Sequence, residues 1–350
     1  MLTERENYIR TVRFGGPEWI PIGISMLDAL WYELGEELER IVLRHPVLFP
    51  DYKKGSRDFK TWQPDRMTGT TERDPWGVLW EFDYDGIEGQ AIEHPLDDWA
   101  KFDAFTPPDP AKYTDRGEID WPVWHQRIRD RKARADLTGA GLDHGFFLMR
   151  LWYLRGFENL MLDFATDEPR LRDLCEMVTK RNLYFVNEFV KAGVDRVYFG
   201  EDIGTQTASI ISPADFKEWC VPHYKRVMSP VREAGIIVDT HHDGYVMELV
   251  DLLLECGVDV LNPQDLCNGL DNIEKYIKGR CCIKLDIDRQ KIVPFGTPRE
   301  IDELIEEEVK RFGSPDGGLS MVVGVLPPTP PENVEALFTA FDKYRTYFWE

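Results

Sequence analysis

Short apolar runs alternate with amphipathic stretches along most of the chain. The apolar runs that predict buried strands lie within residues 15–25, 47–51, 146–152, 194–200, 236–242, 258–262, 281–288 and 319–324. Stretches with helical spacing of apolar residues lie at 26–42, 167–193, 212–235, 245–255, 298–312 and 331–347. Thr3 and Glu6 have capping-box spacing, Asp167 is expected to cap the helix that follows it, and a break is expected near Ser229–Pro230.

Apolar strands between amphipathic helices are typical of a parallel sheet that is covered by helices on both faces. The eight strands predict a (β/α)8 TIM barrel of the α/β class, preceded by an N-terminal helix. No glycine-rich dinucleotide or phosphate loop follows any strand, which disfavours an open doubly wound sheet. We therefore expect a single barrel domain over residues 1–350.

An aromatic-rich insertion is predicted at about residues 54–142, where the regular alternation stops. Residues 74–92 alternate across an Asp-Gly pair, which predicts a β-hairpin, and residues 121–135 have helical character. The insertion contains six tryptophans, at positions 62, 76, 80, 99, 121 and 124. They either form a satellite core or make a lid over a pocket.

The charge balance narrows the classes of partner. Lys and Arg number 42 against 63 Asp and Glu, and this formal charge of −21 disfavours binding to nucleic acids and to anionic membrane surfaces. No signal-peptide core and no run of about 20 apolar residues is present, so we expect a cytoplasmic protein. The six cysteines form no C-x-x-C pair and are expected to be reduced thiols, with Cys175, Cys220 and Cys256 in the core.

Functional residues of a barrel collect at the carboxyl ends of its strands. The predicted strands bring to that end Arg150, Trp152, Tyr153, Glu201, Asp202, Gln206, His241, His242, Asp243, Asn262, Gln264, Asp265, Asp286 and Asp288. Carboxylates and imidazoles in such number are suited to divalent-metal binding or proton transfer. Because side chains alternate along a strand, only one of the two adjacent histidines faces inward, and we expect it to be His241.

Structural roles compete with these functional ones. Asp202 and Asp288 could cap helices or loops, and Asp286 could be an ion-pair partner. Asn262 and Gln264 could hold loops together, and Arg150 could be either an anion clamp or the buried partner of an acid. The remaining histidines are interpreted as surface or packing residues: His45, His94, His125, His144 and His223.

Several segments in order along the chain carry a resemblance to a known family. They are Thr3–Glu6, Pro17–Ile22, Asp74–Gly77, Gly200–Thr207, Ile211–Phe216, His241–Gly244, Asp286–Gln290, Gly296–Ile301 and Pro330–Ala336. With these segments the chain resembles the uroporphyrinogen decarboxylase superfamily, which includes cobalamin-dependent methyltransferases. The resemblance implies a single (β/α)8 barrel.

The chain departs from both main patterns of that superfamily. The decarboxylase holds porphyrin carboxylates with an arginine-rich N-terminal segment, whereas residues 20–31 contain no arginine. Thiol-methylating members hold zinc through His-x-Cys-Gly and a later cysteine, but the motif here reads His241-His-Asp-Gly244, and no cysteine lies near Gly324–Val325. A His and carboxylate set makes a harder site than thiolates do, which disfavours methylation of a thiol.

The resemblance therefore favours a demethylating methyltransferase. It would move a methyl group from a methoxylated donor, such as an aromatic ether, to a corrinoid held on a partner protein. A homodimer is a possible assembly for such a protein. The residues expected to act in catalysis are His241, Asp202 and Asp286; those expected to hold zinc are His241, Asp243 and Glu201; those expected to bind the donor are Arg150, Trp152, Tyr153, Asn262 and Gln264. Two alternatives are a lyase that binds a small acid through Arg150 and Arg155, and a noncatalytic barrel that binds a small ligand.

Overall fold

A computed structural model describes residues 2–349 and contains a curled sheet of seven parallel strands covered by helices. The strands pair in the order β1-β10-β9-β8-β7-β6-β5. Their bounds are β1 Ile22–Met26, β5 Gly139–Gly141, β6 Arg196–Gly200, β7 Ile237–His242, β8 Val260–Pro263, β9 Cys282–Asp286 and β10 Leu319–Val325. The predicted α/β barrel class is confirmed, with β1 paired to the last strand and β5 at the opposite edge.

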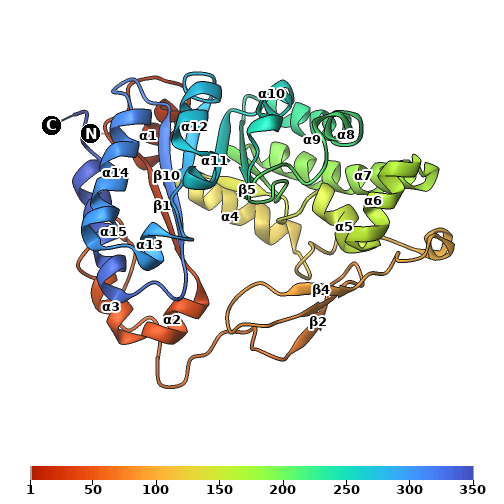
Figure 1. The fold of residues 1–350 in the computed structure, drawn as a ribbon, viewed down its shortest axis with the longest axis horizontal. Coiled ribbons are helices and arrows are strands. Elements are labelled where there is room, and N and C mark those ends of the chain that lie inside the picture. Colours follow the sequence, from red (N-terminus) through yellow and green to blue (C-terminus); the bar gives the residue numbers. More distant parts are fainter. Residues whose placement is uncertain (1, 350) are drawn as a thin grey trace.

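The helices surround this sheet (Figure 1). Their bounds are α1 Glu4–Val12, α2 Asp28–Leu34, α3 Glu36–Val42, α4 Trp121–Ala133, α5 Leu148–Arg155, α6 Phe157–Thr166, α7 Pro169–Ala192, α8 Pro213–Asp215, α9 Val221–Glu233, α10 Val250–Glu255, α11 Asp265–Asn268, α12 Leu270–Tyr276, α13 Ile292–Phe295, α14 Pro298–Phe312 and α15 Pro331–Tyr344. The capping box of Thr3 and Glu6 opens α1, as predicted. Within residues 2–349, no helix is long and apolar enough to span a bilayer.

The strand predicted at residues 146–152 is wrong, because these residues lead into and form part of α5. The strand at this point of the sheet is β5, which has the sequence Gly-Ala-Gly and pairs with Arg196–Tyr198 of β6. A short apolar run does not distinguish a strand from a buried helix, and glycine-rich segments have low strand propensity. The end of α5 at Gly156, whose φ is 80°, is the local signal for a helix.

The strand predicted at residues 47–51 is also wrong. This segment forms turns, and Val47 is 58% exposed. The sheet therefore has seven strands in residues 2–349 instead of eight, and β1 and β5 are edges that do not pair with each other. Residues between α3 and α4 connect these two edges.

Two details of the helices also differ from the predictions. Glu168, and not Asp167, is the N-cap of α7, while Asp167 ends α6 in the left-handed conformation. α9 continues through Pro230 without a break, and the irregular turn lies earlier, at the π-helical residues Phe216–Cys220. Pro230 has no backbone N–H and so removes one hydrogen bond of the helix. The helix continues because its packing against neighbouring elements offsets this loss.

The insertion contains the predicted hairpin within a three-stranded antiparallel sheet of β2 Thr71–Arg73, β3 Leu79–Glu81 and β4 Gln90–Glu93. Figure 1 shows that it extends from the region of α2 to that of α5. Three of its six tryptophans, Trp76, Trp99 and Trp121, are buried in the same hydrophobic cluster as the barrel, and the other three are partly buried and pack against it. The predicted helix is present as α4.

A buried ion cluster fastens the insertion to the helices behind β5. Asp115 of the insertion accepts hydrogen bonds from Arg150 of α5 at 2.6 Å and from the indole of Trp76 at 2.7 Å. It also lies 2.6 Å from Arg181 of α7. Both arginine side chains are 4% exposed, so this carboxylate balances two cations that are removed from water.

Candidate functional site

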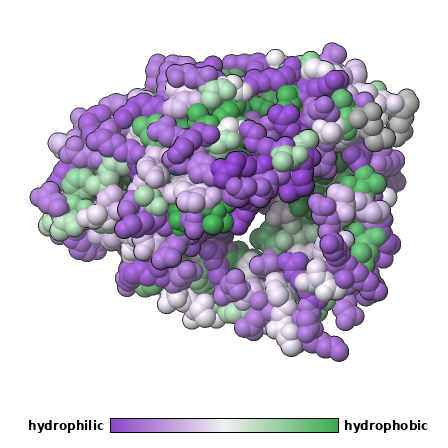
Figure 2. Space-filling model, turned by 180° about the vertical axis from the view of Figure 1, so that it is seen from behind, coloured by the Kyte–Doolittle hydropathy of each residue, from purple (hydrophilic) through white to green (hydrophobic). Residues whose placement is uncertain are grey.

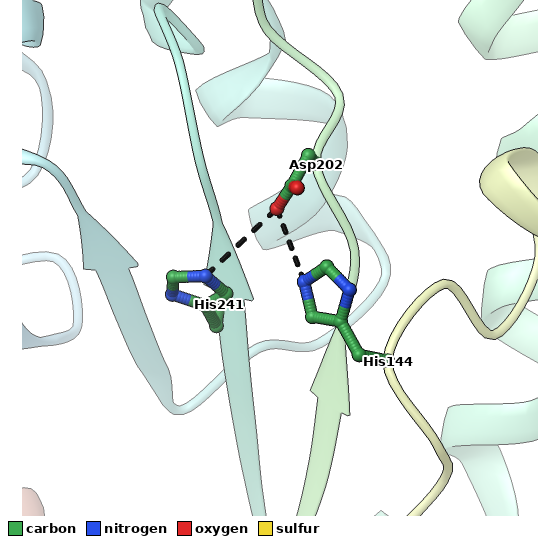
Figure 3. A group of neighbouring side chains, drawn as sticks. All are labelled: His144, Asp202 and His241. Atoms are coloured by element: carbon green, nitrogen blue, oxygen red, sulfur yellow. Dashed lines mark hydrogen bonds and ion pairs between the residues drawn. The ribbon is translucent and has the colours of Figure 1, made fainter. Parts of the chain in front are cut away.

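The site is built at the carboxyl ends of neighbouring strands. Asp202 follows β6, His241 and Asp243 lie at the end of β7, and Asp286 ends β9. His144 reaches the same place from the loop after β5 (Figure 3). Because all these strands are parallel, their ends meet at one rim, and residues far apart in the sequence become neighbours.

His241 is held as a neutral imidazole with one known tautomer. The Asn262 side chain donates through Nδ2 to the carbonyl of Lys284, so its Oδ1 faces His241 Nδ1 at 2.7 Å. An amide oxygen only accepts, so His241 Nδ1 carries the proton and Nε2 presents a lone pair. Burial lowers the pKa of His241 to about 4, which keeps the ring neutral at pH 7.

The lone pair of His241 meets two carboxylate oxygens. Nε2 lies 3.3 Å from Asp243 Oδ1 and 3.9 Å from Asp202 Oδ1. Figure 3 shows His241 and His144 both directed at Asp202. Three electron-pair donors that converge in this way repel one another unless a cation or a proton lies between them.

His144 and Asp202 form an ion pair at this rim. His144 Nε2 donates to Asp202 Oδ1 at 3.1 Å. Burial alone would lower the pKa of His144, but the hydrogen bond to Asp202 and its charge raise it above the usual value. Burial would likewise raise the pKa of Asp202, and the bond and charge of His144 outweigh it and hold that pKa low. The pair can therefore store a proton beside the lone pair of His241.

Arg289 joins the other two acids of the site. Its Nη2 donates to both oxygens of Asp243, at 2.6 and 2.7 Å, and lies 3.5 Å from Asp286. Burial raises the pKa of Asp286 to about 7, and the charge of Asp243 adds to the effect while Arg289 opposes it. Burial also raises the pKa of Asp243. Arg289 thus keeps two close carboxyl groups in one site.

Glu201, predicted as a metal ligand, lies outside the groups that could hold one. It is fully buried, accepts hydrogen bonds from the backbone N–H groups of Phe147 and Met149 at 3.2 and 3.0 Å, and receives the hydroxyl of Tyr224. Burial raises its pKa to about 7 despite these donors. In this position Glu201 caps the first turn of α5 and supports the loop that carries His144.

The residues predicted to bind the donor are only partly brought together. Asn262 orients His241, and Gln264 accepts the backbone N–H of Gly244 at 3.0 Å, so both act through the loop after β7. Arg150 is the buried partner of Asp115, which was one of the two predicted readings. Trp152 and Tyr153 lie on α5, and Tyr153 packs edge-on against Trp80 of the insertion at 4.8 Å between ring centroids.

The other carboxyl and imidazole groups named from the sequence have structural partners. His242 is fully buried on the other side of β7, where Nδ1 contacts the carbonyl of Glu201 at 2.9 Å. Asp288 accepts the backbone N–H groups of Gln290 and Lys291, which fits the capping role. Asp265 accepts the N–H of Asp288 at 2.8 Å and so joins the ends of β8 and β9.

Comparison with known proteins identifies the family of this chain. Residues 80–344, most of the chain, match the family described as uroporphyrinogen decarboxylase (URO-D). The chain belongs to the uroporphyrinogen decarboxylase family. The resemblance of its sequence segments to this superfamily is therefore confirmed.

Similarity to individual members of the uroporphyrinogen decarboxylase family is distant. The chain is 24% identical over 206 residues to uroporphyrinogen decarboxylase from Syntrophotalea carbinolica, which covers 57% of this chain and 53% of that protein. It is 24% identical over 266 residues to the enzyme from Myxococcus xanthus, covering 74% and 72%. The chain thus spans about half the length of the first relative.

One solved structure shares the fold over its whole length. A methyltransferase from Methanosarcina mazei superposes with a TM-score of 0.67 at 17% identity and covers 98% of this chain and 99% of that one. At this identity the superposition establishes a common fold. Together with the family match, it supports the α/β barrel class.

The rim of this uroporphyrinogen decarboxylase family member contains two groups that fit a divalent metal. They are His144, Asp202 and His241, and His241, Asp243 and Asp286, and within each group the donor atoms lie within 4.8 Å of one another. Two histidines and a carboxylate are a ligand set of catalytic zinc sites, which keep a fourth position open. The Asn262 carbonyl behind His241 is the type of outer partner that fixes a ligating imidazole. The residues present therefore fit zinc.

Two members of the site were missed in the sequence. His144 was interpreted as a surface or packing residue because the strand before it was placed too late; had Gly139–Gly141 been taken as the strand, His144 would have followed its carboxyl end. Arg289 gave no signal of its own. Its Nη1 lies 3.2 Å from the position that a Cβ atom at Gly324 would take.

Proposed function

We propose that this protein is a methyltransferase that moves a methyl group from a methoxylated donor to a corrinoid held on a partner protein. The observation that carries the proposal is the convergence of His241 Nε2 with the carboxylates of Asp202 and Asp243. A site that binds a cation or proton so closely is suited to assist a poor leaving group. The full-length likeness to a methyltransferase supports this reaction class, whereas the family model and the sequence relatives are named for a decarboxylase.

The reaction needs an acid at the leaving oxygen. Cob(I)alamin on the partner protein would accept the methyl group with its electron pair, the carbon–oxygen bond of the ether would break, and the oxygen would keep the electrons of that bond and take up a proton. His144, whose pKa Asp202 raises, holds that proton at Nε2. Zinc, when held by His144, Asp202 and His241, would polarise the same oxygen. Asp243 and Asp286 balance the charge on Arg289 beside this centre.

The lyase alternative loses its proposed anion clamps. Arg150 is bound to Asp115, and Arg155 donates to Asp163 at 2.7 Å and lies over the Trp99 ring at 4.0 Å. Both residues are 3% exposed. A substrate carboxylate would have to displace a buried partner to reach either cation. These two residues therefore do not support the lyase hypothesis.

The test is methylation of cob(I)alamin. The protein is incubated with its corrinoid partner and a panel of methoxylated aromatic donors, and conversion to methylcob(III)alamin is followed by absorbance. We expect His144→Ala to lose at least about 100-fold in rate, because His144 holds the proton on one route and would be a zinc ligand on the other. His125→Ala is the matched control. His125 lies on α4, its Nε2 is 2.6 Å from Glu188 Oε2, and it is not part of the rim.

Two results would overturn the proposal. The first is failure of every donor to methylate cob(I)alamin with the partner present, which would favour the hypothesis of a noncatalytic barrel that binds a small ligand. The second is equal activity of the His144→Ala and His125→Ala proteins. Elemental analysis of protein purified without added metal distinguishes zinc from His144 as the acid. Stoichiometric zinc that is lost in His241→Ala supports metal assistance, and absence of zinc supports His144 as the acid.

A further inference from the structure

The inside of this barrel is not filled by side chains in the usual way. Interiors of (β/α)8 barrels are normally packed with branched residues. Here a cavity of about 970 Å³ is lined by Gly23 of β1 and by Gly139 and Ala140 of β5, the two edge strands. The face drawn in Figure 2 is hollowed between two parts of the molecule. Small residues at the unpaired edges leave this space open.

Glycines also let large polar side chains turn into the interior. A Cβ atom at Gly139 would lie 3.2 Å from Arg196 Nε, and one at Gly141 would lie 3.0 Å from Tyr198 Cβ. Arg196 and Tyr198 line the cavity together with Lys284 of β9. The glycines of β5 therefore make room for the polar wall.

That wall carries more positive than negative charge. Five cationic and three acidic residues line the cavity, in a chain whose net charge is −21. Lys284 and Arg196 share a single carboxylate, that of the fully buried Asp239, with Arg196 Nη1 at 3.0 Å. One of the two charges is therefore left uncompensated by this acid.

Arg345, at the end of α15, is the second cation without its own acid. Its guanidinium carbon lies 5.6 Å from the centroid of Trp19, which also lines the cavity. None of the ion pairs in the described part of the chain includes Arg345. Burial lowers the pKa of Arg345, although the charges of Asp342 and Glu4 act to raise it. A partly buried cation on an aromatic ring is available to a ligand anion.

We propose that this cavity binds a small organic acid with an apolar body. The carboxylate would lie against Arg345 or the Lys284 and Arg196 pair, and the body would contact apolar lining such as Ile22 and Val322. A cavity of about 970 Å³ is at the upper end of the range for small-molecule sites. The charge of the wall selects an anion over a neutral molecule of the same shape.

The cavity is separate from the rim at which His241 lies. Tyr198 is a lining residue of the cavity, and its ring also stacks near His241, with 6.4 Å between ring centroids. His144, Asp202, His241 and Asp286 are not among the lining residues. This proposal therefore does not depend on the proposed methyl transfer.

The experiment is calorimetric titration of the full-length protein with 1-naphthoate, and with 1-naphthamide as the neutral molecule of the same shape. We expect naphthoate to bind at least about tenfold more tightly than naphthamide. Arg345→Gln should remove most of this preference, and Arg345→Lys should restore part of it. Arg299→Gln is the matched control, because it removes one cation from a side chain that is 85% exposed on α14.

The outcomes are separable. Equal affinity for the acid and the amide would overturn the proposal, as would an Arg345→Gln protein that binds naphthoate as the wild type does. His241→Ala should leave naphthoate affinity within about twofold, and a larger loss would show that the cavity and the rim are one site. Circular dichroism of each variant, with Arg345→Lys as the conservative partner, distinguishes a lost site from a lost fold.

Discussion

Replacing Asp115 by Asn should destabilise the protein more than any change of Arg150. Asp115 lies 2.6 Å from both Arg150 and Arg181, and the Trp76 ring lies under both guanidinium groups, at 5.0 and 4.7 Å. Burial would raise the pKa of Asp115, but the charges of the two arginines outweigh it and hold that pKa low. The Asn variant keeps the shape and leaves two buried cations with one anion fewer.

The size of the loss follows from the burial of this cluster. Removing the partner of a buried ion pair costs about 3–5 kcal/mol, because the remaining charge is uncompensated. Unfolding of a 350-residue chain has an entropy of about 0.7 kcal/mol/K, so the expected fall in Tm is about 4–7 °C. Arg150→Met should lower Tm less, because Asp115 retains Arg181 and because Arg150 Nε and Nη1 have no hydrogen-bond partner in the described residues.

The assay is thermal unfolding followed by circular dichroism at several scan rates. Asp251→Asn is the matched control: Asp251 pairs with Arg280 at 2.7 Å, but their side chains are 81% and 44% exposed, so Tm should change by less than about 1 °C. A fall for Asp115→Asn no larger than for this control would refute the reasoning. A larger fall for Arg150→Met than for Asp115→Asn would show that Asp115 is not the shared partner.

Two further predictions concern the rim and the core. Asn262→Leu removes the acceptor that fixes the His241 tautomer, so zinc affinity, measured by competition with a chromophoric chelator, should fall about 10- to 100-fold; an unchanged affinity would contradict the tautomer assignment. Burial and the charge of Asp265 raise the pKa of the fully buried Glu308, so the stability that its protonated form contributes is present below about pH 4 and is lost as pH rises towards the folded-state pKa. In urea unfolding, the free energy of unfolding of Glu308→Gln should therefore rise relative to that of the wild type between about pH 5 and 8. An equal pH dependence of the two free energies would count against a buried proton.

The parts of the fold with strong local patterns were predictable from the sequence. β6, β7, β9 and β10 were found because a parallel strand that is buried on both faces is a continuous apolar run, and α14 because a capped amphipathic helix has a clear start and period. The rule that function collects at carboxyl ends then selected Asp202, His241 and Asp243, and the structure brings these side chains together. Their roles in catalysis and zinc binding stay predictions.

The errors have one physical origin. β5 has three residues, two of them glycine, so neither propensity nor periodicity marks it, whereas the apolar run at 146–152 is buried as a helix that neighbours surround. Misplacing this strand moved Arg150 to the rim and His144 away from it. Arg289 was not found because its closest acidic partner, Asp243, follows β7, which lies near β9 only in the folded sheet, with β8 between them.

The glycines that hid β5 from the sequence pattern also explain what the barrel can hold. A strand with side chains at positions 139 and 141 would be easier to predict, but its Cβ atoms would lie 3.2 Å from Arg196 Nε and 3.0 Å from Tyr198 Cβ, so both neighbours would have to shift. Tyr198 would then lose its place between the cavity and His241, and the loop that delivers His144 would start from a different register. The weak strand signal and the room for Arg196 and Tyr198 therefore depend on the same two residues, and a substitution such as Gly141→Val should disturb the cavity and the rim together.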